Sequence, residues 1–87
     1  MIKYSKEEMF NEFEKNKNLV LYVGYFKTIR NSYGAGRSVE YLKDGNTCMR
    51  LKYDVAKSIN LEDNRTFYKV KDGFATEYIY NQFFNEQ

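Results

Sequence analysis

The sequence contains no histidine, no proline, no tryptophan and a single cysteine, Cys48. Without histidine, Ser-His-Asp and Cys-His nucleophilic catalysis are excluded, and the commonest metal ligand is missing. One cysteine excludes an internal disulfide and any cysteine-rich zinc site. These absences predict a protein that is not an enzyme and that holds neither a metal ion nor an organic cofactor.

Long hydrophobic runs are also missing. The longest mainly apolar run, residues 19–26, is far shorter than the roughly 20 residues that cross a bilayer. The N-terminal region is rich in glutamate and has no apolar stretch typical of a secretory signal. With 87 residues and no glycine- or serine-rich linker, the chain is expected to form one domain over residues 1–87. We therefore expect a cytoplasmic domain with no membrane contact.

The residues that are abundant point to an origin and to a mode of action. Phe, Tyr, Met, Ile, Asn and Lys, which have AT-rich codons, number 42, whereas Gly, Ala, Arg and Pro number 12. This bias indicates a gene from an AT-rich bacterium, its phage or another mobile element. The nine tyrosines and seven phenylalanines are more aromatic side chains than a core of this size can fully bury. Because aromatic residues and arginine are enriched where protein interfaces derive their binding energy, the surplus favours a binding protein.

The N-terminal region has the pattern of an amphipathic helix over residues 5–17. Ser5 followed three residues later by Glu8 is a capping-box pattern, and Met9, Phe10 and Phe13 share one helical stripe. The next segment, residues 18–30, is rich in β-branched and aromatic residues and predicts a strand. Its apolar residues occupy both faces, which is typical of a central strand or of a strand that is covered on one side and used as an interface on the other.

Two Asp-Gly pairs predict β-hairpins, because both residues tolerate the positive φ of a type I′ turn. The first is Asp44-Gly45 and the second is Asp72-Gly73, and the predicted strands flanking them are residues 39–43, 47–55, 66–71 and 74–80.

Two segments are compatible with either strand or helix, namely residues 47–60 and residues 76–86. In the first, Met49 and Leu51 alternate with Cys48 and Arg50 as in a strand. The predicted fold class is α+β, with the N-terminal amphipathic helix packed on a four- to five-stranded antiparallel sheet built from the Asp-Gly hairpins.

Cys48 is the one candidate nucleophile, and Arg50 is a candidate stabiliser of its thiolate. The strand alternation places Cys48 on the face opposite Met49 and Leu51, where a partly exposed side chain is expected. Because no histidine is present to act as a base, we interpret Cys48 as a tolerated free thiol rather than a catalytic one.

The candidate partner-binding residues lie in and around the glycine-containing loop of residues 31–38. They are Arg30, expected at the end of the first strand, Tyr33 and Arg37 in the loop, and Arg50 on the hairpin. Guanidinium groups bind carboxylates or phosphates in a bidentate manner, and the three arginines would converge if the loop folded over the hairpin.

The function expected from these features is that of a small non-enzymatic binding protein. Its size and composition fit a phage or mobile-element inhibitor of host defence, of the anti-CRISPR or anti-restriction type, that blocks a host protein or ribonucleoprotein effector. The alternative is a nucleic-acid-binding accessory protein that uses the basic segment 27–57, since residues 19–57 carry seven basic and three acidic side chains. The aromatic residues near the C-terminus, Tyr80, Phe83 and Phe84, are expected to pack on the sheet or to form a homodimer contact.

Overall fold

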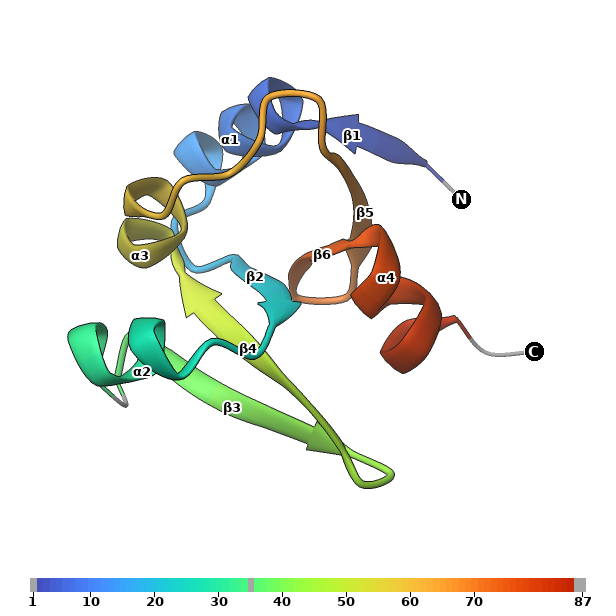
Figure 1. The fold of residues 1–87 in the computed structure, drawn as a ribbon. Helices are drawn as coiled ribbons and strands as arrows, with labels where there is room; N and C mark the ends of the chain where they lie inside the picture. The colour runs from blue at the N-terminus through green and yellow to red at the C-terminus, as the bar shows by residue number, and fades with distance from the viewer. Residues whose placement is uncertain (1, 35, 86–87) are drawn as a thin grey trace.

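The computed structural model describes residues 2–34 and 36–85, which form an α+β fold with a six-stranded mixed sheet (Figure 1). The strands are β1 (Lys3–Ser5), β2 (Val20–Gly24), β3 (Ser38–Lys43), β4 (Asn46–Lys52), β5 (Thr66–Val70) and β6 (Gly73–Thr76). The helices are α1 (Lys6–Lys15), α2 (Lys27–Tyr33), α3 (Tyr53–Ser58) and α4 (Glu77–Ile79), the last continuing into the π-helical turn η1 (Tyr80–Phe84).

The strand order is β1-β5-β6-β2-β4-β3, and all neighbours are antiparallel except β2 and β6. The α+β class is as predicted, but a purely antiparallel sheet of four or five strands is wrong in strand number and in direction. The parallel pair joins segments that are far apart in sequence, with Val20 opposite Gly73 and Tyr22 opposite Ala75. Local sequence patterns do not predict a pairing between strands that are so far apart in the chain.

Helix α1 forms as its sequence predicts. The side chain of Ser5 accepts a hydrogen bond from the backbone N–H of Glu8 at 3.1 Å, and the Glu8 carboxylate accepts one from the N–H of Ser5 at 2.8 Å. This reciprocal capping box satisfies two N–H groups that a helix N-terminus leaves unpaired. Met9 and Phe13 from the apolar stripe are fully buried.

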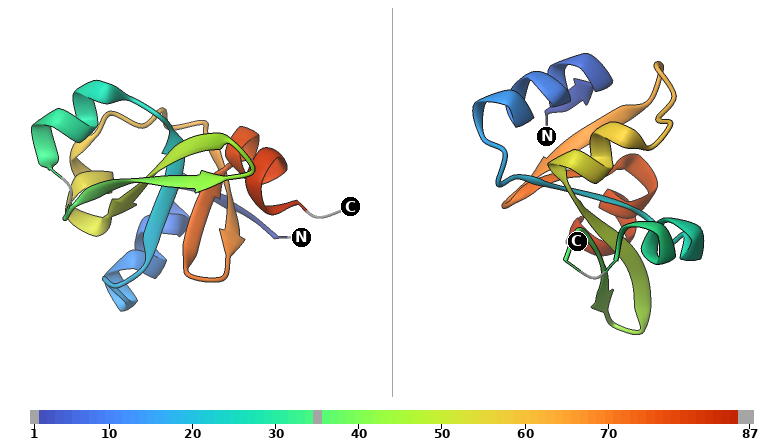
Figure 2. Two further views of the ribbon diagram at one scale, coloured as in Figure 1. Left: turned by 90° about the horizontal axis from the view of Figure 1, so that it is seen from below. Right: turned by 90° about the vertical axis from the view of Figure 1, so that its left-hand side faces the viewer.

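One face of the sheet carries the larger core, which α1 and α3 cover (Figure 2). Met9 and Phe13 come from α1, and Val55 and Ala56 from α3. The remaining buried members are Leu21, Val23, Met49, Leu51, Leu61, Phe67 and Phe74. Each large buried side chain contributes roughly 1.5–3 kcal/mol, so this layer supplies most of the apolar burial of the small domain.

The opposite face carries a smaller core, which the C-terminal helical segment covers. Its buried residues are Tyr22, Cys48, Val70, Ala75, Ile79 and Phe83. Phe84 packs edge-on against Tyr22 and stacks with Tyr41, and Lys43 Nζ donates to the carbonyl oxygen of Phe83 at 2.7 Å. Tyr80 packs against Tyr68. The expected packing of the terminal aromatic residues on the sheet is confirmed.

The two Asp-Gly pairs have different structural roles. Asp44 and Gly45 are the two residues between β3 and β4, and their φ angles are 53° and 80°, as a type I′ turn requires. Gly73 instead lies in β6 opposite Val70, so the residues between β5 and β6 are Lys71 and Asp72. The turn predicted at Asp72-Gly73 is therefore displaced by one residue.

The strand predicted over residues 18–30 ends at Gly24, and the following segment is helix α2. Phe26, Ile29 and Tyr33 have helical spacing, which outweighs the strand propensity of the individual residues. The helix ends at Tyr33 and is capped by Gly34, whose φ of 76° is favourable for glycine. The predicted loop at residues 31–38 therefore starts later, and Ala35 lies outside the described residues.

Both ambiguous segments contain helix. Strand β4 ends at Lys52 and helix α3 begins at Tyr53. The first part of residues 47–60 is therefore a strand, and a helix follows it. Strand β6 ends at Thr76, and α4 and η1 follow it. The helical interpretation of the tail is thus correct for its described part.

Candidate functional site

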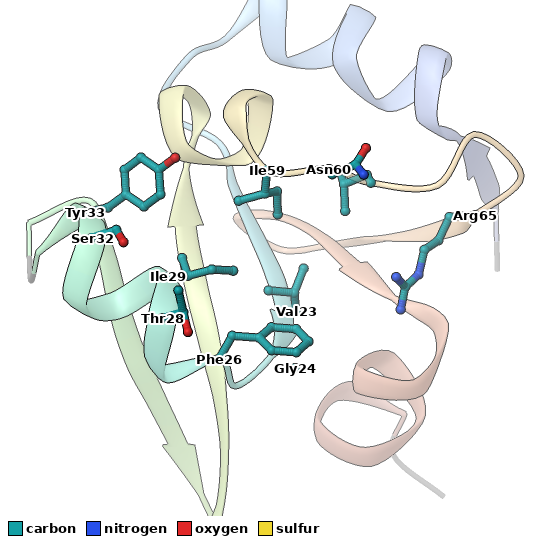
Figure 3. A pocket seen from close by; sticks show the side chains of 11 residues that line it. Val23, Gly24, Phe26, Thr28, Ile29, Ser32, Tyr33, Ile59, Asn60 and Arg65 are labelled. Atoms are coloured by element: carbon teal, nitrogen blue, oxygen red, sulfur yellow. The ribbon is translucent and has the colours of Figure 1, made fainter.

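A groove of about 500 Å³ lies between helix α2 and the segment of residues 59–65 that follows α3 (Figure 3). This volume is within the range of ligand-binding clefts in proteins. Apolar side chains form most of its surface, and Thr28, Ser32, Asn60 and Arg65 are its polar lining residues. The lining residues are Val23, Gly24, Phe26, Thr28, Ile29, Ser32, Tyr33, Ile59, Asn60, Leu61 and Arg65.

Helix α2 forms one wall and is held on the sheet by both apolar and polar contacts. Ile29 and Tyr33 pack against the larger core. On the side toward β3, Arg30 Nε lies 3.2 Å from Glu40 Oε1, and Arg30 Nη1 donates to the carbonyl oxygen of Ser38 at 3.3 Å. The helix is therefore fixed from both sides, and the side chains of its groove face have a defined position.

The segment after α3 forms the other wall. The N–H of Ile59 donates to the carbonyl oxygen of Val55 at 3.1 Å, which closes α3. Lys6 Nζ from α1 then donates to the carbonyl oxygen of Leu61 at 3.1 Å and pairs with Asp63 Oδ1 at 2.8 Å. These bonds tie a segment without regular secondary structure to the first helix. The groove is thus built from parts that three separate regions of the chain hold in place.

The groove is bordered by exposed aromatic surface. Phe26, which lines the groove, is 57% exposed although it is a large hydrophobic residue. Tyr25, the preceding residue in the chain, is 40% exposed. The ring of Phe26 lies beside Val23 and Gly24 at the groove (Figure 3). An exposed aromatic next to an apolar hollow is a typical feature of a surface that binds a partner.

The structure does not bring the four residues that the sequence singled out into one site, although Arg30 and Tyr33 both lie on α2. Tyr33 lines the groove, and Arg30 lies on α2 rather than at a strand end, paired with Glu40. Arg37 pairs with Asp54 of α3, with Nε 2.7 Å from Oδ2. Arg50 lies opposite Tyr22 in the β2–β4 register, on the sheet face of the smaller core. Arg50 therefore does not converge with Arg30 and Arg37, because it lies on the other face of the sheet.

Arg65 is the functional candidate that sequence reasoning missed. Among the described residues that line the groove it is the only charged one, and no carboxylate accompanies it there. Within residues 2–34 and 36–85, no carboxylate oxygen lies within 4.0 Å of its guanidinium nitrogens. Arg65 follows an acidic turn, and its sequence context contains no signal that would place it at this groove.

Cys48 is fully buried in the smaller core, so the expectation of a partly exposed thiol is wrong. The strand alternation correctly put it opposite Met49 and Leu51, but the C-terminal helical segment covers that face as well. Burial raises the pKa of the Cys48 thiol to about 11 from its ordinary 9.0. The thiolate, which is the nucleophilic form, is therefore disfavoured at neutral pH.

The same burial predicts a loss of stability in alkali. Cys48 titrates near pH 9.0 when unfolded and near 11 when folded, so its neutral form stabilises the native state below pH 9. This contribution is lost as the pH rises from about 9 to about 11. Burial, followed by the hydrogen bond to Asp72, also raises the pKa of Tyr22 to about 12, which extends the decline. Urea unfolding between pH 9 and pH 11 should show that the free energy of unfolding falls less in Cys48→Ala than in the unmodified protein. An equal fall in both proteins would contradict this account.

Comparison with known proteins adds no identification: no family model matches the chain, and neither does any curated protein or solved structure. In the described part of the chain, no helix is long and apolar enough to cross a membrane. Among the same residues, no three acidic or cysteine side chains gather closely enough to hold a metal ion.

Proposed function

We propose that this chain is a small non-enzymatic protein that binds another protein through the groove between α2 and residues 59–65. The observation that carries the proposal is the combination of an apolar hollow of about 500 Å³ with the exposed ring of Phe26 at its border. Inserting a partner's apolar side chain would remove both surfaces from water. Burial of one large side chain contributes roughly 1.5–3 kcal/mol, which is the size of an interface hot spot.

The nucleic-acid alternative has less support from the geometry. It requires several cations along one surface to follow a phosphate backbone. Arg30 and Arg37 are already paired with Glu40 and Asp54, and Arg50 lies on the other face of the sheet. The groove itself is mainly apolar, which suits a protein side chain better than a phosphate.

Within this proposal, the partner class that we favour is a host-defence effector in the bacterial cytoplasm, blocked sterically as anti-CRISPR and anti-restriction inhibitors do. Small size and AT-rich composition support this class, and the groove supplies a contact surface for it. The buried thiol of Cys48, with its raised pKa, supports a binding role over nucleophilic catalysis.

The experiment compares two variants of helix α2 in affinity capture from nuclease-treated host lysate at about 200 mM salt. Ser32→Arg places a long side chain at the groove, whereas Asn31→Arg adds the same charge at an exposed neighbouring position that does not line it. We expect Ser32→Arg to abolish capture of the partner and Asn31→Arg to retain it. Equal capture by both variants would contradict the groove as the docking site.

Salt dependence separates the two candidate functions. A site with several phosphate contacts loses roughly 10³–10⁵ in affinity between 50 and 200 mM salt. An apolar groove should lose far less, because burial of apolar surface does not depend on screened charges. If affinity falls steeply with rising salt and Ser32→Arg does not change the binding, the nucleic-acid alternative is favoured.

A further inference from the structure

Resting on the proposed function, we infer that the partner segment bound in the groove carries a carboxylate next to its apolar side chain, and that Arg65 binds this carboxylate. Figure 3 shows Tyr33 and Arg65 on opposite sides of the groove, with Ile29, Ile59 and Val23 between them. The site thus has an apolar centre, a phenol on one side and a guanidinium on the other. A matching ligand is apolar in the middle and acidic at the Arg65 side.

The charge distribution supports an acidic ligand over a basic one. Of the lining residues in the described ranges, one is cationic and none is anionic. Glu62 and Glu77 border a second hollow that shares Arg65 with the groove, and Glu8 and Asp63 border a third. Within the described residues, none of these four carboxylates reaches 4.0 Å from the guanidinium. A carboxylate arriving through the groove therefore meets donors that no described ion pair occupies.

The geometry also gives the carboxylate a favourable setting. A bidentate guanidinium–carboxylate pair combines charge with two parallel hydrogen bonds. A bound apolar side chain would exclude water from the same groove, and ion pairs are less screened where water is excluded. Arg65 lies in an exposed position, so its substitution should leave the fold intact.

The experiment selects phage-displayed random short peptides on the intact protein and on two variants, Ser32→Arg and Arg65→Glu. On the unmodified protein we expect enriched peptides that combine an aromatic or aliphatic residue with a nearby Asp or Glu. Arg65→Glu should reverse the preference to Lys or Arg, and Ser32→Arg should abolish the enrichment. Circular dichroism and thermal unfolding verify that each variant is folded.

A thermodynamic cycle then tests the pair directly. The most enriched peptide is synthesised with its acidic residue and with the corresponding amide, and both forms are titrated into the unmodified protein and into Arg65→Gln. We expect the amide form to lose about tenfold in affinity for the unmodified protein and nothing for Arg65→Gln. Equal losses for both proteins would overturn the inference.

The two proposals fail in different ways. Peptides that depend on the groove but show no acidic preference would overturn the role of Arg65 and leave the groove as the docking site. If no enriched peptide is sensitive to Ser32→Arg, the groove is not a peptide-docking site, and the proposed function fails together with the inference.

Discussion

Replacing Gly73 with alanine should destabilise the protein by more than about 3 kcal/mol, because the added methyl group would meet backbone and not a movable side chain. A Cβ at this position would overlap the carbonyl oxygen of Val20 and lie 2.7 Å from the carbonyl carbon and nitrogen of the same residue. Val20 and Gly73 are directly paired in the parallel β2–β6 contact. Relief would require these two central strands to separate.

Gly24→Ala is the matched control, since Gly24 also lies in the sheet. Apart from its two chain neighbours, no described residue has a heavy atom within 4 Å of the position that an added methyl group would take there. Urea unfolding of both variants, followed by circular dichroism, measures the difference. Small domains have total stabilities of about 5–15 kcal/mol, so Gly73→Ala should unfold at much lower urea concentration, whereas Gly24→Ala should differ little from the unmodified protein. Equal stabilities would show that β2 and β6 do not approach as closely as described.

The two Asp-Gly pairs show where sequence reasoning about the fold reaches its limit. Both pairs have the same local chemistry, and at Asp44-Gly45 that chemistry corresponds to the turn that forms. At Gly73 the requirement for glycine comes from Val20, a residue of another strand. Turn propensity depends only on residues that are close in the chain. It therefore does not reveal a constraint that a parallel pairing with a distant strand imposes.

Helix α1 was predictable because everything that specifies it lies within it: the capping box at Ser5 and Glu8, and the stripe of Met9 and Phe13. Helix α2 was missed although Phe26, Ile29 and Tyr33 have helical spacing. That helix begins only three residues after the end of a true strand, and the side chain of its N-cap residue, Phe26, makes no capping hydrogen bond. Strand-forming residue types therefore dominated the interpretation.

The groove could be predicted only in part. Tyr33 was selected from sequence and lines it, but its other wall comes from residues 59–65, which become neighbours of α2 only through the tertiary fold. Arg65 carries no local motif, and its importance follows from its position as a charge within a mainly apolar lining. The burial of Cys48 was missed for a related reason. Alternation along a strand defines two faces but does not tell whether the second is covered.

The covering of that second face can be tested by Phe83→Ala. Phe83 is 2% exposed and lies in the smaller core together with Cys48 and Ile79. Removing a buried phenylalanine ring costs about 3–5 kcal/mol, because the lost burial is accompanied by a cavity. Tyr78→Ala is the control, since that ring belongs to the same helical segment but is 70% exposed. We expect thermal unfolding to shift strongly downward for Phe83→Ala and little for Tyr78→Ala.

The reactivity of the Cys48 thiol tests whether Phe83→Ala loosens the packing of the smaller core itself. In the unmodified protein, burial and the raised pKa of about 11 should make Cys48 nearly unreactive toward a thiol reagent at pH 8. Phe83→Ala removes part of the layer over the smaller core, so labelling should accelerate at temperatures well below the unfolding transition. Tyr78→Ala should label as slowly as the unmodified protein, because its largely exposed ring does not belong to the smaller core. Fast labelling of the unmodified protein, or equal rates in all three, would show that the C-terminal helical segment does not shield this face of the sheet.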